Sequence, residues 1–316
     1  MTKKIVLPTP YRGIITPMVT PLLNDETIDI TGLTCLIEHL VEGGVHGIFL
    51  LGTTGEGPSL SYKMKHELIE RTCQIANNRV PVLVCISDSS PSESIALAKF
   101  SEKNNVAAVV AAPPFYFGIN KQELIQYYQK LADKLPLPLF IYNIPSQTKV
   151  MVDVSTVQTL SSHPNIIGIK DSSGNAPHFN MLLSQLQAYE SFSVFVGPDE
   201  MLSTTVLMGG HGGVNSGSNL YPKLFVDLYN AAVNGDLKRV LELHQKVMLL
   251  SFNIYQLGDT GASFLKGLKL AMSTEGICSD FMLSPLIPLE NSKKSTVKSY
   301  IESSVMEIPF ENNCNN

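Results

Sequence analysis

One lysine in the chain ends an apolar run and is followed at once by polar, turn-forming residues. The stretch reads Ile166-Ile-Gly-Ile-Lys170-Asp-Ser-Ser-Gly174. An apolar run of this length between turn residues is typical of a buried parallel strand, which places Lys170 at the strand's carboxyl end. A lysine amine that is partly shielded from water can attack a carbonyl carbon and form a Schiff base. The alternative is a lysine that extends from the strand end into water.

A hydroxyl-rich loop follows another apolar run, residues 47–51. It reads Gly52-Thr-Thr-Gly-Glu56. Its glycines leave backbone N–H groups open and its hydroxyls add donors at the start of a helix, an arrangement that binds anions. We therefore expect Gly52, Thr53 and Thr54 to bind a substrate carboxylate.

Tyr142 ends a third apolar run, residues 137–142, and begins the segment Tyr142-Asn-Ile-Pro145. A tyrosine beside an imine-forming lysine can carry protons to and from a bound substrate. A carboxylate loop, a lysine and a tyrosine at strand ends together form the set that 2-oxo acid chemistry requires.

Three more strand ends carry candidate residues, and each has a plainer interpretation. A tyrosine usually packs, a glycine-rich turn usually only turns, and an aspartate before a helix usually caps it. The candidates are Tyr116 in Pro113-Pro-Phe-Tyr-Phe117, Asp199 and Glu200 in Gly197-Pro-Asp-Glu200, and Asn215 and Ser216 in the glycine-rich segment 209–219.

The elements that position these residues repeat as a strand followed by a helix. Such units imply parallel strands with right-handed crossovers, and eight of them close a (β/α)8 TIM barrel. A doubly wound open sheet is the alternative, but no GxGxxG segment opens the first helix. The strands are expected at residues 13–16, 47–51, 80–85, 106–111, 137–142, 166–170, 192–196 and 212–216.

The barrel is expected to span residues 11–235 and to be the catalytic domain. Helical patterns continue at 237–254, 262–274 and 292–304, so residues 236–305 are predicted to form an all-helical C-terminal appendage. The asparagine-rich residues 306–316 are expected to form a disordered tail.

Composition narrows the class of partner. The 316 residues carry a formal net charge of −5, with 44% hydrophobic and 16% charged residues. No run of like charges is present, which argues against nucleic acid and membrane surfaces as partners and leaves small molecules.

The apolar segment near the N-terminus is too short for a signal peptide, so a cytoplasmic location is expected. The histidines and cysteines lack the HxH, HExxH and CxxC spacings of metal sites, and no metal or other cofactor is expected.

These motifs resemble a known family, the class I pyruvate-dependent lyases and synthases (the dihydrodipicolinate synthase / N-acetylneuraminate lyase family). The resemblance covers residues 11–290, with GTTGE, YNIP and GIKDSSG in the family's order. It implies that Lys170 forms an imine with pyruvate, that Tyr142 relays protons, and that Thr53 and Thr54 hold the carboxylate. It also implies that Tyr116 reaches a neighbouring subunit's site in a homotetramer, a dimer of dimers.

Departures from the family pattern bear on the substrate. Gln147 stands where the dipicolinate synthases carry an arginine for the second substrate's carboxylate. Without that cation the carboxylate would lose a charge-assisted contact of about 1.5–3 kcal/mol. In contrast, Asp199, Glu200 and Ser216 resemble the residues with which N-acetylneuraminate lyase binds sugar hydroxyls. Thr53 replaces the serine more usual in sialic acid lyases.

The sequence thus predicts a cofactor-free aldolase that cleaves a hydroxylated 2-oxo acid into pyruvate and an aldehyde. The expected substrate is of the sugar-acid type, such as N-acetylneuraminate or 2-keto-3-deoxygluconate. The alternatives are 4-hydroxy-tetrahydrodipicolinate synthase, a deoxy-sugar-acid dehydratase, and a non-catalytic binding protein with the same fold.

Overall fold

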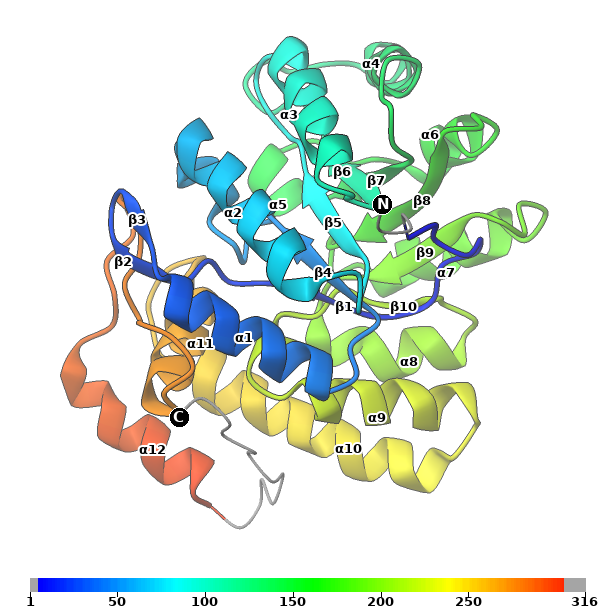
Figure 1. Cartoon of the computed structure of the whole chain (residues 1–316). Helices are drawn as coiled ribbons and strands as arrows, with labels where there is room; N and C mark the ends of the chain where they lie inside the picture. Colours follow the sequence, from blue (N-terminus) through cyan, green and yellow to red (C-terminus); the bar gives the residue numbers. More distant parts are fainter. Residues whose placement is uncertain (1–4, 304–316) are drawn as a thin grey trace.

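A closed barrel of eight parallel strands forms the centre of the computed structural model, which describes residues 5–303 (Figure 1). Each strand pairs in parallel with the next unit's strand, and the first pairs with the last. The predicted (β/α)8 barrel is therefore confirmed. The strands are β1 (Gly13–Pro17), β4 (Gly47–Leu50), β5 (Val82–Cys85), β6 (Ala108–Ala111), β7 (Leu139–Asn143), β8 (Ile166–Asp171), β9 (Ser193–Val196) and β10 (Gly212–Gly213).

Helices surround the barrel, and their ends follow local sequence signals. Ser61, the N-cap of the second helix, accepts a hydrogen bond from the Met64 N–H at 3.3 Å. Asn120 and Glu123 form a reciprocal capping box at the start of the fourth. The helices are α1 (Ile30–Glu42), α2 (Tyr62–Ala76), α3 (Pro91–Lys103), α4 (Lys121–Ala132), α6 (Val154–Leu160), α7 (Ala176–Gln185), α8 (Leu202–Leu207) and α9 (Pro222–Val233).

Spacing of apolar residues explains how a helix lies on the barrel. In α1 the buried side chains include Leu33, Leu36, Ile37 and Leu40, which recur at the three- and four-residue steps of one helical face. The charged residues of α1, such as Glu38, lie off that face; Glu38 pairs with Arg79 at 2.6 Å. The helix therefore covers the outer surface of the strands.

The C-terminal appendage is helical, as predicted, and α10 packs against α9 (Figure 1). It consists of α10 (Leu237–Leu250), a π-helical turn η4 (Ser251–Tyr255), α11 (Ser263–Thr274), a short turn η5 (Asn291–Lys293) and α12 (Lys294–Ile301). The predicted disordered tail, residues 306–316, lies outside the described residues. Within residues 5–303, no helix combines the length and the apolar character that crossing a bilayer would need.

Several predicted boundaries are wrong, for identifiable reasons. The last strand ends at Gly213 rather than Ser216, because the following residues turn into a 3-10 helix, η3 (Ser216–Asn219), whose first N–H groups donate to Asp199. A helix predicted to run to Ile254 changes to π geometry at Ser251. A hairpin, β2 (Leu22–Asn24) and β3 (Thr27–Ile28), and a short helix, α5 (Pro145–Thr148), were not predicted.

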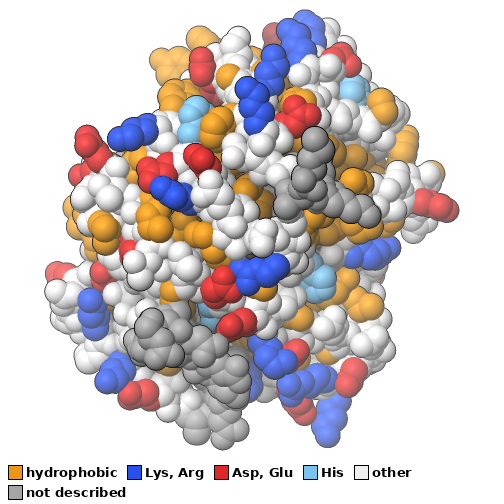
Figure 2. All heavy atoms as spheres, viewed as in Figure 1, with side chains coloured by type: hydrophobic (Ala, Val, Ile, Leu, Met, Phe, Trp, Pro, Cys, Tyr) orange, Lys and Arg blue, Asp and Glu red, His pale blue; other side chains and the backbone are white. Residues whose placement is uncertain are grey.

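Charged side chains are mixed on the face of the molecule seen in Figure 2. Lysine and arginine side chains alternate with aspartate and glutamate, and no large area of a single sign is visible.

Candidate active site

Lys170 and Tyr142 lie side by side at the carboxyl end of the barrel. They occupy paired positions on β8 and β7, so the parallel ladder itself sets them next to each other. The Lys170 Nζ lies 4.3 Å from the centre of the Tyr142 ring and 5.0 Å from that of Phe49. Only 6% of Lys170 is exposed, so its amine is enclosed by aromatic side chains rather than extended into water. This contradicts the interpretation of Lys170 as a solvent-exposed strand end.

The loop after β4 brings hydroxyl and N–H donors to the same place. The Thr53 hydroxyl lies 3.2 Å from the Tyr142 hydroxyl. Leu51 and Glu56, at the two ends of the loop, take the left-handed conformation, with φ of 61° and 53°. Within the described chain the backbone N–H groups of Thr53 and Thr54 donate to no protein atom. Two neighbouring open N–H groups and a hydroxyl form a site suited to a carboxylate.

A second group of predicted residues surrounds Thr54. The Thr54 hydroxyl contacts the Ser216 hydroxyl at 2.9 Å, which links the loop after β4 to the loop after β10. Asn215, beside Ser216, is fully buried and donates from its Nδ2 to the Gly197 carbonyl at 3.1 Å. Its Oδ1 has no hydrogen-bond partner among the described residues. The geometry therefore brings Thr54, Asn215 and Ser216 together.

Asp199 stabilises the loop that carries Ser216. Its carboxylate accepts the N–H groups of Ser216 and Gly217, at 2.9 and 2.8 Å, and the hydroxyl of Tyr255 at 2.5 Å. Burial raises the pKa of the Asp199 carboxyl to about 7, against the opposing effect of the Tyr255 hydrogen bond. Burial and the neighbouring Asp199 raise the pKa of Tyr255 well above its usual value, so Tyr255 remains a donor. Asp199 thus contacts the loop backbone, and its binding of substrate hydroxyls stays a prediction.

The two remaining candidates point elsewhere. Glu200 accepts a hydrogen bond from the Ser251 hydroxyl of the C-terminal appendage. Tyr116 is 77% exposed, stacks edge-on against Phe117 with ring centres 5.1 Å apart, and belongs to an exposed aromatic segment with Phe115. Neither side chain contacts Lys170 within the single chain that the structure describes.

A cavity of about 350 Å³, the mouth cavity, opens at the carboxyl ends of β4 to β7. Thr53, Tyr142, Gln147 and Phe115 are among the residues that line it. This volume lies within the range of small-molecule sites. Lys170 does not itself line the mouth cavity and adjoins it through Tyr142, whose ring the Lys170 amine contacts.

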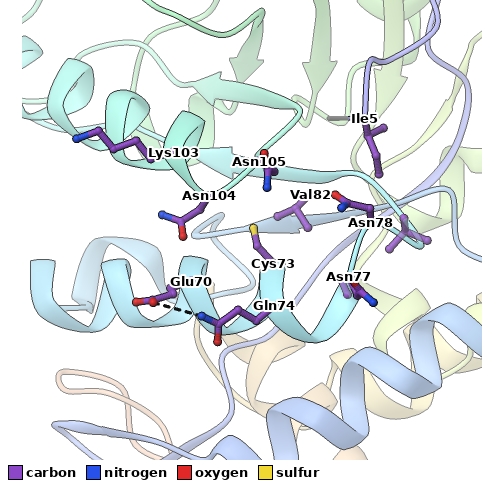
Figure 3. Close-up of a pocket in the computed structure, with 12 residues that line it drawn as sticks. Ile5, Glu70, Cys73, Gln74, Asn77, Asn78, Val82, Lys103, Asn104 and Asn105 are labelled. Carbon is purple, nitrogen blue, oxygen red and sulfur yellow. Dashed lines mark hydrogen bonds between the residues drawn. The ribbon is translucent and has the colours of Figure 1, made fainter. Parts of the chain in front are cut away.

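A separate cavity of about 230 Å³ lies at the opposite, amino end of the barrel (Figure 3). Asparagine side chains surround it, and Lys103 extends away from it. Burial raises the pKa of the Cys73 thiol there to about 12, so that this thiol stays protonated. The Cys73 thiol is therefore a poor nucleophile, in keeping with a barrel end that serves stability rather than catalysis.

Two supporting contacts carried no recognisable signal in the sequence. Glu56 and Lys269 form an ion pair at 2.5 Å that is completely buried. Asp171, next to Lys170, accepts from the Asn143 Nδ2 at 2.7 Å and from the Ser173 hydroxyl at 3.0 Å. The first contact stabilises the loop of residues 52–56, and the second stabilises the carboxyl end of β8. No group of three or more histidine, cysteine, aspartate or glutamate side chains within residues 5–303 could hold a metal ion.

Comparison with known proteins places this site in context. The model of the dihydrodipicolinate synthetase family matches residues 10–304. A 4-hydroxy-tetrahydrodipicolinate synthase of Neisseria gonorrhoeae is 30% identical over 93% of this chain and 98% of its own length. The putative 2-dehydro-3-deoxy-D-gluconate aldolase YagE of Escherichia coli is 30% identical over 92% and 96%. The solved structure of dihydrodipicolinate synthase from Bacteroides thetaiotaomicron is 48% identical, with a TM-score of 0.90 over 93% and 98%.

Proposed function

The chain belongs to the dihydrodipicolinate synthetase family, and on that premise we propose that it is a lysine-imine aldolase that cleaves a hydroxylated 2-oxo acid into pyruvate and an aldehyde. One observation carries the proposal: the buried Lys170 amine lies against the Tyr142 ring, beside open N–H groups of a hydroxyl-rich loop. The three groups supply a nucleophile, a proton carrier and a carboxylate site side by side at the carboxyl end of the barrel.

The first step forms the imine. The 2-oxo acid binds with its carboxylate at the N–H groups of Thr53 and Thr54, which turns its C2 carbonyl toward Lys170. The Lys170 Nζ attacks C2, and loss of water leaves a C=N bond. The surrounding rings of Tyr142 and Phe49 exclude water from this amine.

The second step breaks the carbon–carbon bond. In the first step the Tyr142 phenol gives its proton to the departing water, which leaves a protonated imine and a phenolate. The phenolate then takes the proton of the C4 hydroxyl, the C3–C4 electron pair moves into the protonated imine, and the aldehyde departs. Protonation of the resulting enamine at C3 and hydrolysis of the imine release pyruvate and restore Lys170. The Thr53 hydroxyl, 3.2 Å from that of Tyr142, orients the phenol and offers a second position for the proton.

The sugar-acid type of substrate has support from the similarity to the E. coli YagE aldolase, whose crystal structure contains pyruvate. Ser216, whose hydroxyl lies 2.9 Å from that of Thr54, would then bind a hydroxyl of the aldehyde half, and Asp199 would position the Ser216 loop. Product analysis tests the proposal directly. Pyruvate plus an aldehyde from 2-dehydro-3-deoxy-D-gluconate or N-acetylneuraminate supports cleavage, whereas a product that keeps every carbon would assign a dehydratase instead.

A second candidate is 4-hydroxy-tetrahydrodipicolinate synthase, which condenses pyruvate with aspartate semialdehyde. The similarity to the Bacteroides thetaiotaomicron enzyme favours it, and the absence of an arginine at Gln147 opposes it. Rates of condensation with aspartate semialdehyde and with glyceraldehyde, measured side by side, discriminate between the two functions.

The exposed segment of Phe115, Tyr116 and Phe117 supports a third part of the proposal, a homotetramer in which Tyr116 enters a neighbouring site. Monomeric behaviour in sedimentation at micromolar concentration would contradict it.

A further inference from the structure

Three basic residues stand at the amino ends of three neighbouring strands, at the end of the barrel opposite to the active site. Strands β10, β1 and β4 lie next to one another in the barrel (Figure 1). His211, Arg12 and His46 each come directly before the first residue of one of these strands. The pairing of Gly13 with Gly212 sets Arg12 and His211 at the same level of the sheet. The sheet therefore brings Arg12 next to His211, with His46 on the other side of β1.

Each histidine presents a hydrogen-bond donor at this end of the barrel. The Nδ1 of His46 accepts the Ile14 N–H at 3.1 Å, and the Nδ1 of His211 accepts the Val194 N–H at 3.1 Å. Burial lowers the pKa of both imidazoles, to about 4 for His211, so both rings are neutral at pH 7 and carry their proton on Nε2. Among residues 5–303, neither Nε2–H group has an acceptor.

Arg12 and Tyr229 add further donors. In the described part of the chain, the Arg12 guanidinium forms no ion pair and no hydrogen bond. Tyr229, in α9, is 8% exposed and packs on the His46 ring with centres 5.5 Å apart, and its hydroxyl likewise has no partner among the described residues. Burial raises the pKa of Tyr229 and lowers that of His211; the Arg12 charge opposes the first effect and adds to the second, so the guanidinium lies near both side chains.

A cavity of about 300 Å³ opens beside these residues, and Arg12 and His211 both line it. Leu183 and Phe192 form apolar parts of its wall. Glu190 is the one acidic residue that lines it, and no ion pair joins Glu190 to Arg12. The cavity therefore combines a cation that lacks a counter-ion, a neutral N–H donor and an apolar wall, with room for a small molecule.

Water satisfies such donors one at a time, whereas an anion accepts from several of them and pairs with the guanidinium charge. We propose that Arg12 and His211 form a binding site for the anionic group, a carboxylate or a phosphate, of a small metabolite. Arg12 supplies a charge-assisted contact of bidentate geometry, and the His211 Nε2–H supplies a neutral hydrogen bond. The site lies at the other end of the barrel from Lys170 and Thr53, so it goes beyond the proposed function and does not depend on it.

The test is equilibrium dialysis of the full-length protein at neutral pH and constant ionic strength, with labelled inorganic phosphate and, separately, labelled acetate. We expect the wild-type protein to bind at least one of these anions. Arg12→Met should weaken that binding by about 10-fold to 100-fold, the value of one charge-assisted contact. His211→Asn should weaken it by about 2-fold to 10-fold, because the asparagine oxygen replaces Nδ1 as acceptor of the Val194 N–H while the Nε2 donor is lost. The anion that binds more tightly identifies the group that the natural ligand carries.

Two controls make the result specific. Arg71→Met removes the same charge from an exposed position of α2 and should leave binding unchanged. The urea midpoint of every variant shows that it is folded; where Arg12→Met yields no folded protein, Arg12→Gln is measured against the same outcomes.

The inference fails if the wild-type protein binds neither anion at tens of millimolar. It also fails if Arg12→Met binds as many anions as the wild type with the same affinity, because the anion then lies elsewhere, such as at the loop of residues 52–56. An equal loss in Arg71→Met would show that the effect comes from net charge alone and would likewise overturn the site.

Discussion

Replacing Lys269 by methionine should weaken both the fold and the binding of pyruvate. Lys269, in α11, is 0% exposed and donates to Glu56 at 2.5 Å and to the Phe281 carbonyl at 2.7 Å. Its removal leaves the buried Glu56 carboxylate with the Leu283 N–H, at 2.8 Å, as its remaining contact. Leaving one partner of a buried pair uncompensated costs about 3–5 kcal/mol of unfolding free energy.

That cost is measurable by urea denaturation. Since unfolding free energy falls by about 1–3 kcal/mol per molar urea, the midpoint of Lys269→Met should drop by about 1 M or more. The matched control is Lys266→Met in the same helix, where the lysine is partly exposed and no buried partner is lost. The double variant Lys269→Met/Glu56→Gln should recover part of the loss, because a neutral side chain replaces the unpaired charge.

The same variant should change pyruvate binding more than chemistry. Glu56 ends the loop that carries Thr53 and Thr54, so a displaced Glu56 disturbs the carboxylate site. The KM for pyruvate should rise while the imine still forms at saturating pyruvate. An unchanged urea midpoint in Lys269→Met, or a double variant no more stable than the single one, would refute the reasoning.

Three further changes give expected outcomes. Tyr142→Phe should keep imine formation and slow turnover by about 10²–10⁴-fold, measured as kcat with saturating pyruvate, because it removes the proton carrier; wild-type turnover would move that role to another group. Gln147→Arg should raise kcat/KM for aspartate semialdehyde relative to glyceraldehyde, because an arginine pairs bidentately with its carboxylate; an unchanged ratio would show that residue 147 does not contact the aldehyde half. Burial lowers the pKa of His211 to about 4, and its Nδ1 accepts the Val194 N–H, so the folded state binds fewer protons than the unfolded state between pH 4 and 6.5. Stability should therefore fall as pH falls through that window, and less steeply in His211→Gln, as followed by urea midpoints.

The barrel could be predicted because each strand is a recognisable apolar run and each helix has residues that mark where it begins and ends. Lys170 and Tyr142 could be placed together because both end strands of a parallel sheet, whose carboxyl ends meet at one mouth. The end of β10 was misjudged because Val214 is a strand-favouring residue that continues the run after Gly213. The contact of Asp199 with the next loop, which ends the strand, is not local.

The supporting contacts could not be predicted, because they join distant parts of the chain. Glu56 and Lys269 are 213 residues apart, and neither position differs locally from an exposed charge. Lys65 lies on the buried face of α2, four residues before Ile69 and seven before Thr72, although a lysine is usually found at the surface. The π-helical turn that brings Tyr255 to Asp199 likewise has no local signal.

The central claim is that the Lys170 amine reacts with pyruvate, and one measurement tests it most directly. The protein is incubated with pyruvate, reduced with borohydride, weighed intact, and then digested to locate the modification. We expect one reduced pyruvyl group per chain, attached to Lys170 and absent from Lys170→Ala, whose folding is checked by its urea midpoint. No adduct, or an adduct on another lysine such as Lys65 that persists in Lys170→Ala, would contradict the account.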